Sequence, residues 1–270
     1  MNDGIHAMSA EDYHASPAVS NSDLKYITGK YTPAHFWAFK DRQIEREETE
    51  AMRIGTLTHR CILEPDTMRD SYAVKPDGMT FASKDGKAWR DAHEGLTIIS
   101  QSHADMIERM MSAVWSHHKA KQIIMASKRE QSLFATDGPV QLRARIDCLP
   151  ENGNIIADLK TTELCDLDSV ESAIFTYGYY RQAAFYLRLA NLLGLKKEKF
   201  ILIFVEKTPP HCVAVYSLDD IAIEAGTAEV RSALSLIKNC TTTGIWPGRD
   251  DGINDASLPN WAIKRIENHL

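Results

Sequence analysis

VQLRARIDCLPENGNIIADLKT, residues 140–161, is the stretch that decides the fold. It contains two strand-like segments, Val140–Leu149 and Ile155–Thr161, which are rich in apolar and β-branched residues. Asn152-Gly153 lies between them and is the strongest short-range signal for a two-residue type I′ hairpin turn. The sequence therefore predicts an antiparallel hairpin, in which only Pro150 beside the turn could shift the register.

The register of this hairpin determines which side chains share a face. A two-residue turn places Asp147 opposite Asp158, with Lys160 on the same face. The residues expected on that face are all charged: Arg143, Arg145, Asp147, Asp158 and Lys160. The residues expected on the other face are all apolar: Leu142, Ala144, Ile146, Cys148, Ala157 and Leu159. We expect the apolar face to pack on a core and the charged face to serve a site.

Two opposed carboxylates repel each other and destabilise a sheet unless a cation neutralises them. The oxygen atoms of Asp147 and Asp158 suit Mg²⁺ or Mn²⁺, and Lys160 beside them could orient or deprotonate a water molecule. This combination fits metal-assisted hydrolysis of a phosphodiester. The D-x-K tripeptide alone is weak evidence, because it occurs more often in solvent-facing hairpins with charges of both signs.

Composition places few limits on function. The chain has 270 residues, of which 44% are hydrophobic and 25% charged, as expected for a globular protein with one large domain. The net charge of −6 argues mildly against a nucleic-acid binder. A carboxylate pocket for cations would nevertheless make a DNA-cleaving protein acidic, and a local basic strip would suffice for phosphate contacts.

Cysteine spacing and hydropathy predict the cellular setting. No C-x-x-C pair occurs, so we expect no zinc ribbon, iron–sulfur cluster or disulfide framework. The sequence contains no apolar run of 18 residues, and its first residues show no secretory signal. We therefore expect a cytoplasmic protein.

Helix and strand signals surround the hairpin. Capping residues before Leu24, Pro33 in a first turn, and the span from the acidic Glu45–Glu50 to Leu63 predict three helices. Residues 66–100 read as turn-rich, with short strands near Ser71–Val74 and Leu96–Ile99. Later elements are expected in this order: helices in 101–126, strands at 132–135, 140–149 and 155–161, a helix at 169–194, strands at 200–206 and 211–217, and a helix at 219–239. This order predicts an α/β fold with a mixed central sheet flanked by helices.

Several motifs in the right order give the chain a family resemblance. Asp147 and Asp158-Leu159-Lys160, read as D-x10-D-x-K, resemble the core motif of the PD-(D/E)xK nuclease superfamily, whose fold is restriction-endonuclease-like. Gln182-Ala-Ala-Phe-Tyr186 resembles the Q-x-x-x-Y motif of the RecB-like and lambda-exonuclease-like branches, and the helix around His59 resembles their histidine helix. Together with Ser20-Asn21-Ser22-Asp23 and Trp246-Pro247-Gly248, the pattern is similar to the exonuclease VIII (RecE) C-terminal nuclease domain.

The resemblance implies a Mg²⁺-dependent exonuclease, with Mn²⁺ as an alternative cofactor. Such an enzyme digests the 5′-ended strand of linear double-stranded DNA and leaves 3′ overhangs for a single-strand annealing protein. It also implies phage or prophage recombination in the cytoplasm of a bacterial host and a ring-shaped trimer or tetramer. One nuclease domain, 1–270, is expected, with an N-terminal helical region (1–65), a catalytic sheet core (128–217) and a tail (244–270).

The resemblance also assigns roles to residues. Asp147, Asp158 and Lys160 would be catalytic, while His59 and the carbonyl of Leu159 would join the two aspartates as metal ligands. A supporting or DNA-binding role falls to a further set: Gln182, Tyr186, Tyr179, Arg145 and Thr161. Tyr179, Gln182 and Tyr186 share one helical face, which is equally typical of packing against a sheet. Glu130 lies one strand ahead of Asp147, where some branches have another acidic residue.

Two alternatives stay open. One is a PD-(D/E)xK endonuclease for restriction or repair. The other is a non-catalytic DNA-binding recombination protein that keeps the fold, against which the intact Asp147, Asp158 and Lys160 argue. A metal hydrolase for another kind of substrate has no supporting signature such as H-E-x-x-H.

Overall fold

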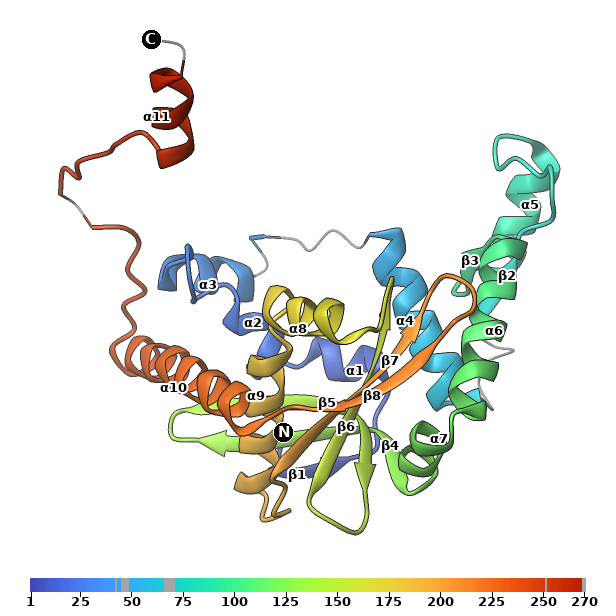
Figure 1. The fold of residues 1–270 in the computed structure, drawn as a ribbon, viewed down its shortest axis with the longest axis horizontal. Helices are drawn as coiled ribbons and strands as arrows, with labels where there is room; N and C mark the ends of the chain where they lie inside the picture. Colours follow the sequence, from blue (N-terminus) through green and yellow to red (C-terminus); the bar gives the residue numbers. More distant parts are fainter. Residues whose placement is uncertain (42, 45–48, 66–70, 251, 269–270) are drawn as a thin grey trace.

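A computed structural model of the chain describes residues 1–41, 43–44, 49–65, 71–250 and 252–268. Its centre is a six-stranded sheet in the order β1-β4-β5-β6-β7-β8 (Figure 1). The strands are β1 (Gly4–His6), β4 (Ser127–Asp137), β5 (Val140–Pro150), β6 (Ile155–Thr162), β7 (Lys199–Glu206) and β8 (Val213–Ser217). β6 and β7 run parallel and all other neighbours antiparallel, which confirms the predicted mixed sheet.

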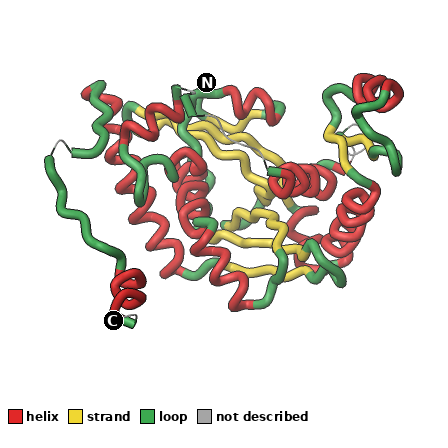
Figure 2. Tube along the Cα trace, turned by 90° about the horizontal axis from the view of Figure 1, so that it is seen from above, coloured by secondary structure: helices red, strands yellow, loops and turns green. Residues whose placement is uncertain are grey.

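Helices cover both faces of this sheet, as Figure 2 shows from above. One core joins the sheet to α9 (Tyr179–Leu192) and α10 (Asp220–Thr243). The other joins it to α4 (Glu50–Leu63), α6 (Gln101–Ser116) and α7 (His118–Met125). Alternation along β7 produces the two cores, because Leu202 and Phe204 belong to the first and Ile203 and Val205 to the second.

The N-terminal region contains the expected helices and one unexpected strand. The helices are α1 (Ala10–Ala15), α2 (Asn21–Leu24) and α3 (Pro33–Lys40), and α4 ends at Leu63 just before Pro65. Ser20 caps α2, and Pro33 occupies the first turn of α3, as the sequence predicted. The sequence predicted no strand in this region, yet β1 pairs with β4 at the edge of the sheet.

A small arm between α4 and α6 also departs from expectation. Its strands β2 (Tyr72–Val74) and β3 (Thr97–Ile99) were predicted, whereas α5 (Lys84–Ala92) lies in a stretch predicted to be turn-rich. The Ser83 side chain accepts a hydrogen bond from the Gly86 amide and starts this helix. A Cβ atom on Gly86 would overlap the Thr80 carbonyl oxygen, so only glycine permits this packing. Residues 66–70, at the start of the turn-rich prediction, lie outside the described residues.

The β5–β6 hairpin has the predicted register but a different turn. Cys148 pairs with Ala157, which places Asp147 opposite Asp158 as expected, so Pro150 does not shift the strands. A type I′ turn requires positive φ at both central residues. Gly153 has φ +87, but Asn152 is not among the described non-glycine residues with positive φ. The buried ammonium of Lys197 holds the hairpin tip instead, through the carbonyls of Pro150 and Gly153 at 2.9 and 2.8 Å.

The charged face of the hairpin is covered rather than open to solvent. Asp147, Asp158 and Arg143 are only 8%, 2% and 7% exposed. Arg143 contacts the Tyr13 carbonyl of α1, Asp147 lines a cleft together with His59 of α4, and Asp158 accepts a hydrogen bond from Gln182 of α9. A buried charge is stable only when it is paired or hydrogen-bonded, so each of these side chains should contact a charged or polar partner.

The C-terminal half follows the predicted order with refined boundaries. Gly178, with φ +69, separates the expected helix 169–194 into α8 (Leu167–Thr176) and α9. A tail leads from α10 to α11 (Asn260–Glu267), which projects away from the body in Figure 1. Of the five cysteines, Cys61, Cys148, Cys165 and Cys240 are buried and Cys212 is exposed, all with free thiols. Among the described helices, none is both long and apolar enough to cross a membrane.

Candidate metal centre

Three side chains from different elements converge on one point beside the hairpin. His59 comes from α4, Glu130 from β4 and Asp147 from β5. One potential ligand atom of each side chain lies within 4.8 Å of those of the other two. Among the described residues, no other group of three His, Cys, Asp or Glu side chains comes this close together. An imidazole nitrogen and two carboxylates are suitable ligands for a divalent cation.

Asp147 is the centre of this group. Its Oδ2 accepts a hydrogen bond from the Leu159 amide at 2.8 Å and lies 3.3 Å from His59 Nδ1. The backbone of β6 therefore fixes the carboxylate, and α4 presents the imidazole to it. The structure brings His59 and Asp147 together as predicted. For Leu159 the observed contact is made by the amide, and ligation by its carbonyl stays a prediction.

Glu130 joins the centre through a distortion of its strand. Its φ of +52 is rare for a non-glycine residue and falls where β4 runs opposite Asp147, between the pairs Arg129–Cys148 and Gln131–Ile146. Arg145 Nε donates to Glu130 Oε2 at 2.6 Å, and a second arm of Arg145 reaches the Met8 carbonyl at 3.1 Å. Arg145 thus holds Glu130 in place from the neighbouring strand.

Asp158 and Lys160 form a second pair beside the first group. Lys160 Nζ lies 2.5 Å from Asp158 Oδ2, and Gln182 Nε2 donates to Asp158 Oδ1 at 2.8 Å. The Lys160 ammonium also lies 4.7 Å from the centre of the Tyr179 ring. The sequence predicted Asp158 as a ligand beside His59 and Asp147. In the structure Glu130 completes the tight group of three, and Asp158 lies next to it, paired with Lys160.

Burial and mutual repulsion shift two carboxyl groups of the centre toward their neutral forms. Burial and the Asp147 carboxylate raise the pKa of Glu130 to about 7, despite the opposing effect of Arg145. Burial and Asp147 likewise raise the pKa of Asp158 to about 6, despite Lys160. A bound cation would relieve this repulsion and return both groups to the charged form.

The pKa values of Asp147, His59 and Lys160 are instead shifted so that their charged forms are favoured. Burial alone would raise the pKa of Asp147, but His59, Lys160 and the Leu159 amide lower it below its usual range. Burial alone would lower the pKa of His59 and of Lys160, but the neighbouring aspartates outweigh this effect and raise both. Lys160 is therefore held as an ammonium, which favours orienting a water molecule over removing a proton from it.

The supporting residues take distinct positions along α9 and β6. Tyr179, Gln182 and Tyr186 share the helix face that meets the sheet, as predicted, and contact Lys160, Asp158 and Phe200 respectively. Tyr179, rather than Gln182 or Tyr186, is thus the neighbour of Lys160. Thr161 Oγ1 would lie 3.8 Å from a Cβ atom on Gly55, so it faces α4.

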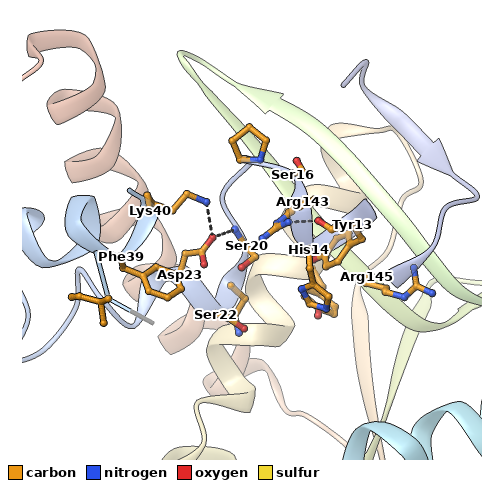
Figure 3. Close-up of a pocket in the computed structure, with 15 residues that line it drawn as sticks. Tyr13, His14, Ser16, Ser20, Ser22, Asp23, Phe39, Lys40, Arg143 and Arg145 are labelled. Atoms are coloured by element: carbon orange, nitrogen blue, oxygen red, sulfur yellow. Dashed lines mark hydrogen bonds and ion pairs between the residues drawn. The ribbon is translucent and has the colours of Figure 1, made fainter. Parts of the chain in front are cut away.

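Two clefts adjoin each other here, and one of them opens onto the centre. A cleft of about 560 Å³ lies between α1 and α4, and His59, Glu130 and Asp147 line it. A second cleft of about 660 Å³, shown in Figure 3, shares His14 and Arg145 with the first. The N-terminal segment forms a wall of both, a role that sequence reasoning missed. The contacts that position this segment, such as the one from Arg143 to the Tyr13 carbonyl, join residues more than a hundred positions apart. The local sequence therefore shows little more than a helix start at Ser9.

Comparisons with known proteins agree with this fold. One solved structure, from Eubacterium rectale and provisionally named an exonuclease, is 12% identical and matches with a TM-score of 0.66 over 96% of this chain and 98% of that one. An alkaline exonuclease from Laribacter hongkongensis is 13% identical, with a TM-score of 0.37 over 87% and 95% of the two chains, a likeness too distant to carry an argument. No curated protein matches the chain.

The comparison with protein families is the decisive one. Residues 20–256 match the family described as a PDDEXK-like domain of unknown function (DUF3799), a range that contains His59, Glu130, Asp147, Asp158 and Lys160. The match covers most of the chain and confirms the resemblance to PD-(D/E)xK proteins that the motifs predicted. The chain belongs to this PDDEXK-like family.

Proposed function

We propose that the protein is a Mg²⁺-dependent exodeoxyribonuclease that hydrolyses phosphodiester bonds of linear double-stranded DNA. The observation that carries this proposal is the convergence of His59, Glu130 and Asp147 within 4.8 Å, beside the Asp158–Lys160 pair. The family match and the likeness to a structure named as an exonuclease support it.

The donor set fits a hard divalent cation. His59, Glu130 and Asp147 would hold it, with Asp158 as a further oxygen donor once its proton is lost. Mg²⁺ and Mn²⁺ prefer carboxylate oxygens and retain water molecules, which suits a half-open cleft. When bound, the cation would supply Lewis-acid stabilisation of charge that develops on the phosphate.

The protein's own residues would orient the reactants. Lys160, held as an ammonium, would donate hydrogen bonds to the attacking water and to phosphate oxygens. Gln182 would keep Asp158 in the geometry that positions Lys160. Arg145 would hold Glu130 at the centre while compensating some of its charge.

The proposal extends to the direction of digestion and to the biological role. By resemblance to RecE-like nucleases, digestion would run 5′ to 3′ and leave 3′ overhangs for a single-strand annealing protein during recombination. A ring trimer or tetramer in the bacterial cytoplasm would be the working form. These features rest on the resemblance to RecE-like nucleases.

The test is a time course on linear duplex DNA labelled at either the 5′ or the 3′ end, with Mg²⁺ or with EDTA. We expect early release of the 5′ label, Mg²⁺ dependence, and no cleavage of a covalently closed circle. Nicking of the circle would instead establish an endonuclease. Undiminished cleavage in EDTA, or none of any DNA with Mg²⁺ or Mn²⁺, would refute the proposal.

A further inference from the structure

Two large aromatic side chains stand in solvent where α8 meets α9. Phe175, near the end of α8, is 78% exposed, and Tyr177, at the turn into α9, is 68% exposed. An exposed apolar side chain is ordinary when it occurs singly, but neighbouring exposed rings mark a contact surface. Both rings lie on the segment that leads directly into the helix with Gln182.

Tyr177 connects to the candidate metal centre through a short series of ring contacts, and Phe175 contacts the next tyrosine along α9. The Tyr177 ring centre lies 5.6 Å from that of Tyr179, and the Tyr179 ring centre lies 4.7 Å from Lys160 Nζ. Phe175 lies 6.2 Å from Tyr180 with nearly parallel rings. The exposed corner, Phe175 and Tyr177, is therefore joined through Tyr177 to Lys160, a residue that would act on the phosphate.

The corner is held rigidly from behind. Tyr180 Oη and Arg181 both bind the Glu229 carboxylate on α10, at 2.6 and 2.8 Å. A Cβ atom on Gly226 would overlap the Tyr180 carbonyl oxygen, so α9 and α10 pack here in close backbone contact. A rigid platform loses little conformational entropy when a ligand stacks on it.

Local charge indicates which portion of a nucleic acid would be accommodated. Acidic side chains on α8, namely Asp166 at its cap, Asp168 and Glu171, oppose contact with a phosphate backbone along that helix. Stacking on a ring needs no phosphate contact and tolerates every base. The ligand that fits is thus a nucleobase freed from its pair.

We propose that Phe175 and Tyr177 form a stacking platform for unpaired nucleobases of the DNA strand next to the scissile phosphate. This inference rests on the proposed function, because it assigns a further DNA subsite to the same centre. A base on Tyr177 would belong to a nucleotide close to Lys160. The platform would hold the strand end in line with the cleft between reaction cycles.

The test uses duplex DNA with a short single-stranded end that carries 2-aminopurine, whose fluorescence falls when the base stacks on an aromatic ring. Binding is measured in EDTA with the full chain. We expect quenching with the wild type, and loss of quenching with about fivefold to hundredfold weaker binding for Phe175→Ala/Tyr177→Ala. The ring-retaining Phe175→Tyr and Tyr177→Phe variants should keep both signals. Ile221→Ala, at a 77% exposed position on α10, is the matched control.

Each result decides one question. Wild-type-like binding and quenching in the double alanine variant would overturn the platform, and so would equal losses in the ring-retaining variants. Loss of self-association without loss of DNA binding would identify the corner as a protein contact and also overturn it. Mg²⁺-dependent cleavage without quenching refutes the platform alone, whereas quenching without any cleavage refutes the proposed function and leaves the platform standing.

Discussion

Strands β4 and β5 carry a buried acidic group at each end, and the two groups are neutralised in different ways. At the turn that joins β4 to β5, Asp137 binds Arg188 at 2.7 Å and Lys238 at 2.5 Å. Burial would raise the pKa of Asp137, but these two cations lower it. At the other end, burial and the Asp147 carboxylate raise the pKa values of Glu130 and Asp158 to about 7 and about 6, and the local cations do not offset this effect.

This difference separates a structural site from a candidate functional one. The Asp137 group balances its own charge and ties the β4–β5 turn to α9 and α10. In the group around Asp147, burial and mutual repulsion shift Glu130 and Asp158 toward their neutral forms, and a cleft opens beside Glu130 and Asp147. Perturbed carboxylates that face a cleft are therefore the better guide to function here than buried charge as such.

Removal of Asp147 should have the largest effect. Asp147→Ala eliminates the carboxylate that His59 and the Leu159 amide both contact, so we expect loss of nuclease activity beyond the roughly 10–100-fold typical of an outer-shell partner. Circular dichroism and thermal unfolding should still report a folded protein. Full activity in this variant would show that the group around Asp147 is not the functional site.

Acidification should act selectively on the same centre. Because the pKa values of Glu130 and Asp158 are raised to about 7 and about 6, both carboxyl groups take up protons as the pH falls through these values. The neighbouring aspartates raise the pKa of His59, so its imidazole also holds a proton more readily than usual. Each protonation competes with the cation, so metal affinity should fall by about a hundredfold or more between pH 7.5 and 5. Isothermal titration with Mn²⁺ checks this, and a flat pH profile would contradict it.

Gln182 tests whether support of Asp158 matters. Gln182→Ala removes the 2.8 Å hydrogen bond to Asp158 Oδ1, and we expect roughly 10–100-fold lower activity at unchanged stability of the sheet. Gln182→Glu, which replaces the donor by an acceptor, should be at least as damaging. Steady-state rates with end-labelled duplex measure both variants, and wild-type rates in both would show that Gln182 only packs.

Asp137 should give the smallest effect and no catalytic one. Asp137→Asn weakens two ion pairs whose cations are partly exposed, so the free energy of unfolding should fall by about 1 kcal/mol. The lowered pKa means that this stabilisation is present above the unfolded-state pKa and is lost as the pH falls through the folded-state value. Urea titration at pH 7 and pH 3 should show a larger difference between variant and wild type at pH 7 than at pH 3.

Much of the fold could be predicted because its signals are local. The Asn152-Gly153 turn and the alternation around it determine the hairpin register, and this prediction survived even though the turn type was wrong. β1 was missed because three residues carry no periodicity, and its pairing with β4 joins segments about 130 residues apart.

Most residues of the candidate site could also be predicted from the sequence. His59, Asp147, Asp158 and Lys160 came from motif spacing, and the structure brings them together. Glu130 was singled out by resemblance alone, and its position beside His59 and Asp147 depends on a positive φ within a strand and on Arg145 from the strand beside it. Such a distortion is a tertiary outcome and leaves no pattern in the sequence.

The distribution of cysteines has a consequence for labelling chemistry. Burial raises the pKa of the Cys61, Cys148, Cys165 and Cys240 thiols, so these groups resist maleimide reagents twice over, by access and by protonation. Cys212, on the β7–β8 connection, is exposed. A fluorophore or spin label can therefore be attached at one defined position of the unaltered chain, which makes distance measurements to a labelled DNA end accessible without a cysteine-free background.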